Sequence, residues 1–426
     1  MAAQARGGAA APALSPSATP DGAAHAGPRA AIRLARALAV FGLALGVRAL
    51  FLLSVRQPAA SQLASFAEDS VHYVAMAQRL LAGHGYSFFG GRPDAYVSPG
   101  YPLFVAGLMH LFPADPLVAI RWSQAVIGAA TAAVAASWGG FLAGVLVALY
   151  PPFIWSTASI LTEVLFLLLL LGYLTLHARL LTSSRPSRGC AVAAGVLLGL
   201  AVLTRPIAAA LPVIIGVVDW VRSARTTARP RQSHRWALLV GAAALVNLPW
   251  WVRNVVVLHR LILFASQAAN PLVAGLKPGG ASIQVPAGTN AYVFAIRYVL
   301  SALRSNPRAF LTWMTVGKWT LALGQPYAGG GPNGGFLQVL ANYQVPLCWV
   351  GAAGLLWAAI FRPRLRVAAI AAATLAILLL GFIPTPRYAD PLMALLAIGA
   401  GALLAGAAGA VVAGLRRLLR RPLTAR

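Results

Sequence analysis

A short polar segment, residues 66–102, holds three of the eight carboxylate side chains of this 426-residue chain. The three are Glu68, Asp69 and Asp94. His72 and Tyr73 follow Asp69 by three and four residues, so a helix over 67–82 would place all three on one face. A carboxylate on such a face can take the proton of an attacking hydroxyl. The alternative is a solvated loop helix whose charges only aid solubility.

A further carboxylate, Glu163, stands in "STASILTEVLFLLLLLGY", at the mouth of the most apolar run of the chain, 159–181. An acid near hydrocarbon costs about 2.5–3.5 kcal/mol at the centre of a bilayer and is usually functional. If this run goes inward, Glu163 lies near the outer surface, on the same side as Asp69. The alternative is an interfacial Glu that caps a helix N-terminus.

Three arginines fall on the predicted outer face, where the positive-inside rule disfavours them. They are Arg205 in "LTRP", Arg253 in "WWVRN" and Arg387 in "PRYAD". A planar guanidinium binds phosphate through two hydrogen bonds at once. For each arginine, and for Lys318, the alternative is a side chain that snorkels beside a helix end. Arg48 and Arg121, inside or beside apolar runs, are candidate structural partners of the acids.

Carboxylates and phosphate-binding cations on one face fit a transfer of sugar from a lipid phosphate. The phosphate of the donor would lie on the arginines. A carboxylate would take the proton of an acceptor hydroxyl as that hydroxyl attacks the anomeric carbon. The leaving phosphate would then be stabilised by fixed positive charge.

The elements that must position these residues are membrane helices. The chain is 59% apolar and 10% charged, with a mean hydropathy of +0.75. A soluble domain carries about 25% charged residues, and a membrane helix needs about 20 mostly apolar ones. Runs of that kind recur, so we predict an all-α polytopic membrane protein with about ten transmembrane helices and a short outer-face loop helix. The net charge of +26 lies in clusters between the apolar runs, which argues against nucleic acid as a partner.

The basic clusters predict the domain organisation and the sidedness. Residues 1–28 are expected to form a disordered cytoplasmic tail. Residues 29–415 would form the membrane domain, with outer loops 56–99 and 253–308, and 416–426 a basic cytoplasmic tail. The number of crossings between two loops must agree with the side of the membrane on which each loop lies. To satisfy this rule, the apolar segments 100–112 and 309–325 are expected to be partial or interfacial spans.

The motifs of this chain resemble those of the GT-C superfamily of integral-membrane glycosyltransferases, and they occur in the same order. The resemblance is to the bacterial family related to protein O-mannosyltransferases (glycosyltransferase family 39-like) and to the aminoarabinose transferase of lipid A. Its first outer loop reads as an acid, three residues, Tyr, then "A..L..G.GY" and "P.YP". The matching residues here are Asp69, Tyr73, Ala77, Leu80 or Leu81, Gly83, Gly85, Tyr86, Pro99, Tyr101 and Pro102. "R.SQ..IGA", "LTE.LF", "LTRP", "PWWVRN" and "PRYADP" follow in order.

The resemblance implies an inverting sugar transfer, outside the cytoplasm, from a polyprenyl-phosphate donor. The expected location is the bacterial inner membrane, with membrane lipids around the chain and a glycolipid, polysaccharide or protein as the acceptor. Expected catalytic residues are Asp69, Glu68 and Glu163; many relatives have the pair as Asp-Glu, so which of Glu68 and Asp69 acts stays open. Expected substrate-binding residues are His72, Tyr73, Tyr86, Tyr101, Arg205, Arg253, Asn254, Lys318, Arg387 and Tyr388. No cofactor is expected, and no ligand spacing requires a divalent metal.

Two other functions compete with this hypothesis. A transporter or lipid flippase would place ionisable groups near the midplane and often shows inverted repeats. No repeat is visible, and the ionisable groups gather on one face. A non-catalytic scaffold would not need Asp69, Glu163 and several outer arginines together.

Overall fold

The computed structural model describes residues 28–55, 63, 67–183, 187–223, 229–278, 283, 285–286, 288–324 and 342–419. Within this part of the chain every regular element is a helix, and seven helices are long and apolar enough to cross a membrane. The all-α polytopic class is therefore confirmed, whereas the predicted number of about ten crossings is not. The predicted tail 1–28 lies outside the described residues except for Pro28.

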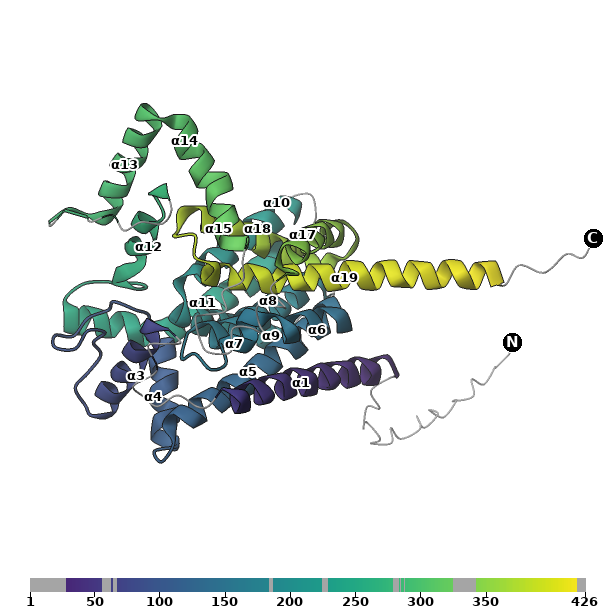
Figure 1. Cartoon of the computed structure of the whole chain (residues 1–426), viewed down its shortest axis with the longest axis horizontal. Helices are drawn as coiled ribbons and strands as arrows, with labels where there is room; N and C mark the ends of the chain where they lie inside the picture. Colours follow the sequence, from purple (N-terminus) through teal and green to yellow (C-terminus); the bar gives the residue numbers. More distant parts are fainter. Residues whose placement is uncertain are drawn as a thin grey trace, which may run out of the picture.

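The seven long helices form the body of the protein (Figure 1). They are α1 (Pro28–Ser54), α5 (Pro116–Gly139), α8 (Glu163–Thr182), α11 (Arg229–Leu258), α17 (Gln344–Phe361), α18 (Arg366–Gly381) and α19 (Pro386–Leu419). The shorter helices α4 (Gly100–Leu111), α9 (Arg188–Thr204) and α10 (Ala210–Ser223) accompany them. The start of α1 and the end of α19 lie at one end of the body, and α3 (Glu68–Leu81) and α4 lie at the other.

The apolar run 139–153 is broken into two helices. α5 ends at Gly139, and Gly140 has a φ of 92°, which favours glycine. α6 (Phe141–Leu149) and α7 (Pro151–Trp155) then follow, separated by an extended Tyr150. α4 has 12 residues, about 18 Å at 1.5 Å per residue, which agrees with the partial span predicted there.

Two helices extend into segments that were expected to be loops. α11 continues through Pro249 to Leu258, so Arg253 belongs to a helix. A proline removes one backbone hydrogen bond, and neighbouring groups in a membrane bundle compensate for the loss. α19 begins at Pro386, which suits the first turn of a helix. "PRYADP" is therefore the first turns of α19 rather than an open loop.

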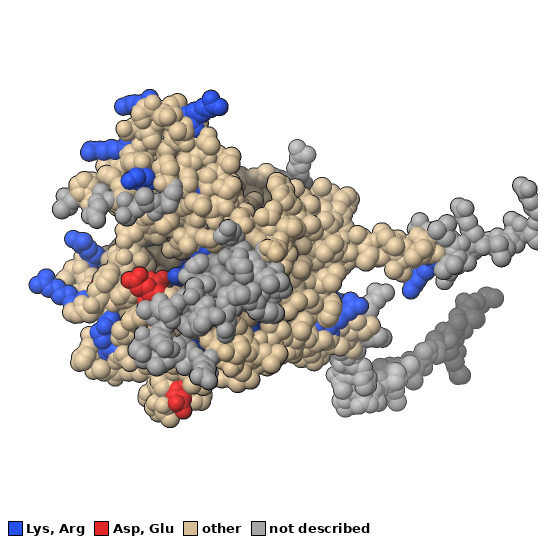
Figure 2. All heavy atoms as spheres, in the orientation of Figure 1, with Lys and Arg blue, Asp and Glu red and all other residues tan. Residues whose placement is uncertain are grey.

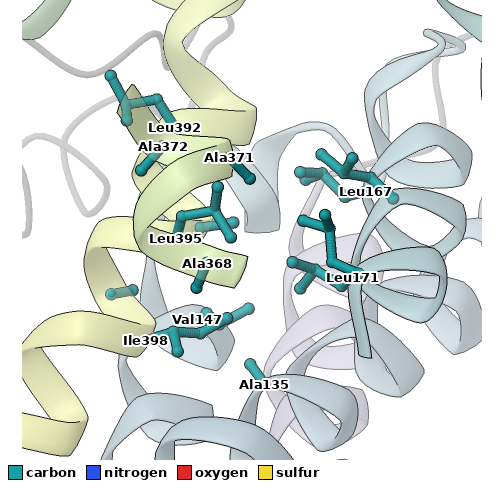
Figure 3. Close-up of a cluster of buried hydrophobic side chains, with 14 of the residues drawn as sticks. Ala135, Val147, Leu167, Leu171, Ala368, Ala371, Ala372, Leu392, Leu395 and Ile398 are labelled. Carbon is teal, nitrogen blue, oxygen red and sulfur yellow. The ribbon is translucent and has the colours of Figure 1, made fainter. Parts of the chain in front are cut away.

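The core lies between helices that present small or aliphatic side chains to each other. Figure 3 shows Leu167 and Leu171 of α8 facing Ala368 of α18 and Leu395 of α19. α17 and α19 also pack together, and a Cβ built on Gly354 would lie 2.0 Å from the carbonyl oxygen of Gly399. Small residues allow such close approach of helix backbones. The glycines thus fix the position of α19, which carries Arg387.

At the end of the body that holds α3, five further elements form a projection. These are α12 (Ala269–Ala274), α13 (Ala291–Ser305), α14 (Pro307–Thr312) and the continuous π-helix η5 (Trp313–Gly317) with α15 (Lys318–Leu323). The predicted helix 67–82 is confirmed as α3. Residues Ser266 and Gln267 donate backbone hydrogen bonds to the carbonyls of Ala95 and Tyr96, so the two predicted outer segments are in contact.

Candidate functional site

A cluster of four charged side chains lies where α3, α8, α9 and α19 meet. Glu163, the first residue of α8, is 1% exposed. Its Oε1 accepts hydrogen bonds from Nη2 of Arg205 at 2.7 Å and from Nε of Arg387. A buried carboxylate is tolerated when it is paired and hydrogen-bonded. The two arginines provide that compensation here.

Asp69 completes the cluster from the outside. Its Oδ2 accepts a hydrogen bond of 2.8 Å from Nη1 of Arg387, and its side chain is 44% exposed. Arg387 therefore bridges a buried carboxylate, Glu163, and an accessible one, Asp69. Glu68 precedes Asp69 on α3 and is exposed, and no ion pair in the described part of the chain joins it to the cluster. Of the two adjacent acids, the geometry favours Asp69.

Arg205 is positioned by a break between two helices. Pro206 disfavours a helical conformation in the residue before it, and α9 accordingly ends at Thr204 with Arg205 extended at φ −143°. Nε of Arg205 donates to Oγ1 of Thr162 at 2.9 Å. Its guanidinium lies 5.5 Å from the ring centroid of Tyr388. The "LTRP" motif therefore presents its arginine to Glu163 through local backbone geometry.

Buried polar side chains hold the loop that precedes Glu163. Gln124 of α5 donates to the carbonyls of Thr157 and Ser159 at 3.0 and 2.9 Å, and Nε of Arg121 donates to the carbonyl of Ala158 at 3.0 Å. The hydroxyl of Tyr101 donates to Gln124 at 2.7 Å. Tyr101 thus has a structural role in the described contacts. The role of Gln124 was missed, although it stands in the "R.SQ..IGA" motif.

Tyr73 lies between this support and the charged cluster. It is buried, and its ring meets that of Tyr101 edge-on at 5.0 Å. Burial raises the pKa of Tyr73 well above its usual value, opposed by Arg387 and reinforced by Asp69. The phenol therefore stays protonated and can donate a hydrogen bond. The prediction that Tyr73 shares a face with Asp69 is consistent with this placement.

The third acid of the opening segment, Asp94, ties the first outer loop together. Its Oδ2 accepts from the backbone N of Phe88 at 2.8 Å, and its Oδ1 accepts from the N of Tyr96 at 3.0 Å. Nη2 of Arg79 donates to the carbonyl of Phe88 at 2.9 Å. His72 stacks on Phe88, with ring centroids 4.6 Å apart. Asp94 and Arg79 therefore order the loop, and His72 packs against it.

Arg253 is not brought together with Arg205 and Arg387, contrary to expectation. Nη1 of Arg253 donates to the carbonyl of Asp94 at 2.6 Å, and Nη2 donates to that of Tyr86 at 3.1 Å. The arginine fastens α11 to the first outer loop. A role in binding phosphate stays a prediction that these contacts do not support.

Three other predicted binding residues are also held by backbone carbonyls. Asn254 donates to Ile262 at 2.9 Å, the hydroxyl of Tyr86 donates to Val97 at 2.9 Å, and Nζ of Lys318 donates to Leu380 at 2.6 Å. Lys318 also donates to Phe382 at 3.1 Å, and so satisfies carbonyls at the end of α18. These contacts fix segments of the backbone, and a role of the three side chains in substrate binding stays a prediction.

Arg48 and Arg121, the candidate structural partners of the acids, both donate hydrogen bonds to backbone carbonyls. Nη1 of Arg48 donates to Ala44 at 3.2 Å and to Ala148 at 3.1 Å. Arg121 binds Ala158, as described above. The carbonyl of Ala148 lies in the last turn of α6, where no further helical turn satisfies it, and Arg48 does so instead. A partnership of Arg121 with an acid stays a prediction.

Asp390 is a further acid near the cluster, for which the sequence predicts only a helix-end position close enough to Arg387 to help orient it. It is 2% exposed, and its Oδ1 has no hydrogen-bond partner within the described residues. It lies one turn after Arg387 on α19, close enough to Glu163 and Arg205 for charge interaction. Its place in "PRYADP", three residues after the arginine, was the available signal.

Among the described residues, no group of three His, Cys, Asp or Glu side chains could hold a metal ion. Asp69 and Glu163 are each bound to Arg387 instead. Independence from metal stays a prediction.

These features define a helical multi-pass membrane protein with an ion-pair cluster at one end of its bundle. No family model and no curated protein matches the chain. Among solved structures it is similar to ArnT from Cupriavidus metallidurans bound to undecaprenyl phosphate, with a TM-score of 0.48 and 18% identity over 87% of this chain. The chain spans 59% of that protein's length. The apo state of the same ArnT gives a TM-score of 0.37 and 16% identity over 89% of this chain and 78% of the other.

Proposed function

We propose that this protein is a membrane glycosyltransferase that moves a sugar from a polyprenyl-phosphate donor to an acceptor hydroxyl. The observation that carries the proposal is the bridge of Arg387 between buried Glu163 and accessible Asp69, with Arg205 beside it. The cluster supplies the two functions that the reaction needs: cations for a phosphate and a carboxylate for a proton.

Several groups around the cluster are available to an anionic ligand. Within the described residues, Nη1 of Arg205 and Nη2 of Arg387 make no hydrogen bond, and both side chains are partly exposed, at 13% and 16%. α3, α8 and α19 all begin here, so the positive ends of three helix dipoles point at the same place. Such termini favour phosphate.

Glu163 and Asp69 would have different roles. Glu163 is buried between two guanidinium groups, so it holds them in place for the phosphate. Asp69 is accessible on one side and bound to a single arginine. A donor phosphate that takes over Nη1 of Arg387 would release Asp69, and the released carboxylate would be the general base.

The proposed chemical step is a direct displacement at the anomeric carbon of the donor sugar. The acceptor O–H gives its proton to Asp69, and the acceptor oxygen forms a bond to the anomeric carbon. The bond from that carbon to the phosphate oxygen breaks, and polyprenyl phosphate leaves on Arg205 and Arg387. Attack from the side opposite the phosphate inverts the anomeric configuration. General-base catalysis contributes about 10²–10⁴-fold to such a step.

A transporter is disfavoured by the position of the cluster. Its members stand at helix ends, at the first residue of α8, the second of α3 and the second of α19. Coupling sites of transporters lie near the bilayer midplane instead. We further propose that the cluster faces outward from the bacterial inner membrane. The acceptor would be a glycolipid, a polysaccharide or a protein.

The test is sugar transfer by the purified chain. Radiolabelled polyprenyl-phosphate sugars would be supplied with membrane extract as the acceptor. We expect label in a new product with the native protein, a loss of at least about 100-fold with Asp69→Asn, and near-native transfer with the matched control Glu68→Gln.

Equal transfer by the native protein and Asp69→Asn would remove Asp69 as the base. A large loss in Glu68→Gln alone would assign the base to Glu68. Transfer from none of the donors, by a protein that stays monodisperse, would contradict the proposed reaction.

A further inference from the structure

The helix α13 presents an apolar face that the rest of the described chain leaves uncovered. Tyr292, Ile296, Leu300 and Leu303 recur at helical spacing and are 52%, 60%, 49% and 37% exposed. A shallow cavity of about 270 Å³ continues this face toward Leu272 of α12 and toward Leu276, which follows α12. An adjoining side of α13, around Ala295, packs against the small core that includes Val273 of α12.

The cations of the same helix flank this apolar face. Arg297 and Arg304 are exposed and stand seven residues apart, so they form one stripe beside Leu300 and Ile296. Arg308, at the start of α14, is also exposed. An apolar face edged by arginines is the pattern of a helix that lies in a membrane interface.

No carboxylate opposes these cations in the sequence. There is no Asp or Glu between Asp219 and Asp390. Figure 2 shows blue spheres and no red ones on the part of the projection that corresponds to α13 and α14 in Figure 1. The surface is therefore complementary to negative charge.

The direction of the projection agrees with an interface. α1 and α19 run along the long axis of the body, and this axis is the expected membrane normal (Figure 1). α13 and α14 extend sideways from the end of the body that holds α3. They would therefore lie along the surface of the leaflet beside the ion-pair cluster.

We propose that α13 and α14 form a docking surface for anionic phospholipid. The apolar face of α13 lies in the acyl region, and Arg297, Arg304 and Arg308 bind the phosphodiester headgroups. This proposal is independent of the catalytic one. It means that α13 and α14 prefer anionic phospholipid in the leaflet they contact.

The test measures the depth of single labels on the full chain in vesicles. In a Cys190→Ser, Cys348→Ala background, a fluorescent label is placed at Leu300→Cys or, as the matched control on the other face, at Ser305→Cys. Vesicles contain phosphatidylcholine alone or with phosphatidylglycerol. Nitroxide lipids quench labels in the bilayer, and iodide quenches labels in water.

With phosphatidylglycerol present, we expect nitroxide to quench the label at 300 and iodide to quench the label at 305. Arg297→Gln with Arg304→Gln should shift the equilibrium of the label at 300 toward water by at least about fivefold. Equal lipid quenching in both vesicle types would overturn the preference for anionic lipid. Equal access of iodide to 300 and 305 would overturn the docking, and protection of 300 from both quenchers would indicate a protein cover instead.

Discussion

At the scale of single residues, Glu163 is the most constrained group of the site. Its carboxylate is buried and shares one oxygen between Arg205 and Arg387. Removing one member of a buried ion pair leaves the other charges uncompensated, which costs more than the pair itself contributes. The buried negative charge of Glu163 and the positive charges of the two arginines therefore compensate each other.

We therefore predict that Glu163→Gln destabilises the protein by about 3 kcal/mol. The amide keeps the shape of the side chain but removes the negative charge between two cations. Thermal unfolding of the purified protein in detergent would measure the effect. Asp115→Asn is the control, because Asp115 is exposed and makes no side-chain cap, and it should change stability by less than about 0.5 kcal/mol. An unchanged midpoint for Glu163→Gln would contradict the ion-pair account.

At the scale of elements, the outer loop 83–99 is a fixed wall of the site. Asp94 ties it internally, and Arg79 of α3 and Arg253 of α11 hold it from two sides. The exposed ring of Phe89 and the ring of Tyr96 lie 4.7 Å apart on this wall. Aromatic faces there could stack on a sugar, which is why the order of the loop matters to the proposed function.

Arg253→Lys tests whether that arginine is structural. Lysine keeps the charge but cannot reach the carbonyls of Asp94 and Tyr86 with one planar fork. We expect amide hydrogen exchange in residues 86–97 to speed up by about tenfold or more, as expected when hydrogen bonds to a charged group are lost. Arg260→Lys, at an exposed position two residues after α11, should leave the exchange unchanged. Unchanged exchange with a weaker affinity for the donor would instead favour the phosphate role.

The packing of α17 against α19 gives a second prediction at this scale. In Gly354→Ala the new methyl group would meet the backbone of Gly399, and the two helices would have to separate. Overpacking costs about 1–3 kcal/mol, more than the helix propensity gained from alanine. In Gly42→Ala the methyl group meets nothing within 4 Å, so that variant should be neutral or stabilising. Equal unfolding midpoints for the two variants would show that α17 and α19 adjust freely.

At the scale of the whole molecule, the two ends of the helical body carry different features. The cluster, the first outer loop and the projection of α13 and α14 lie at one end (Figure 1). At the other end, Trp138 near the end of α5 donates to the carbonyl of Arg364, in the short segment between α17 and α18. α5 and α8 are long and apolar enough to cross a membrane, whereas α6 and α7 are not, so the predicted parity of the crossings stays a prediction.

The orientation can be measured with single cysteines in the Cys190→Ser, Cys348→Ala background. His84 and Arg188 are both exposed, and the proposed orientation puts them on opposite sides of the membrane. An impermeant maleimide added to sphaeroplasts should label His84→Cys but not Arg188→Cys, and inverted vesicles should give the reverse. Labelling of Arg188→Cys in intact sphaeroplasts would reverse the proposed outward orientation.

The sequence by itself determined the class of the fold and the polar residues of the cluster. Long apolar runs require helices in a membrane, because buried backbone groups must be satisfied within each segment. An acid at the mouth of an apolar run, Glu163, and arginines at predicted outer turns are costly, so their types and positions were informative without coordinates. The helix that carries Asp69 followed from local spacing alone.

Only the tertiary structure decided which charged groups meet. Arg205, Arg253 and Arg387 look alike in sequence, yet two share Glu163 while Arg253 binds loop carbonyls. Asp69 and Arg387 are more than 300 residues apart and form an ion pair. Such contacts depend on how α3, α8 and α19 pack, on breaks at Gly140 and Pro206, and on close approach at Gly354. Hydrophobic periodicity specifies which face of a helix is buried, but not which partner it will face.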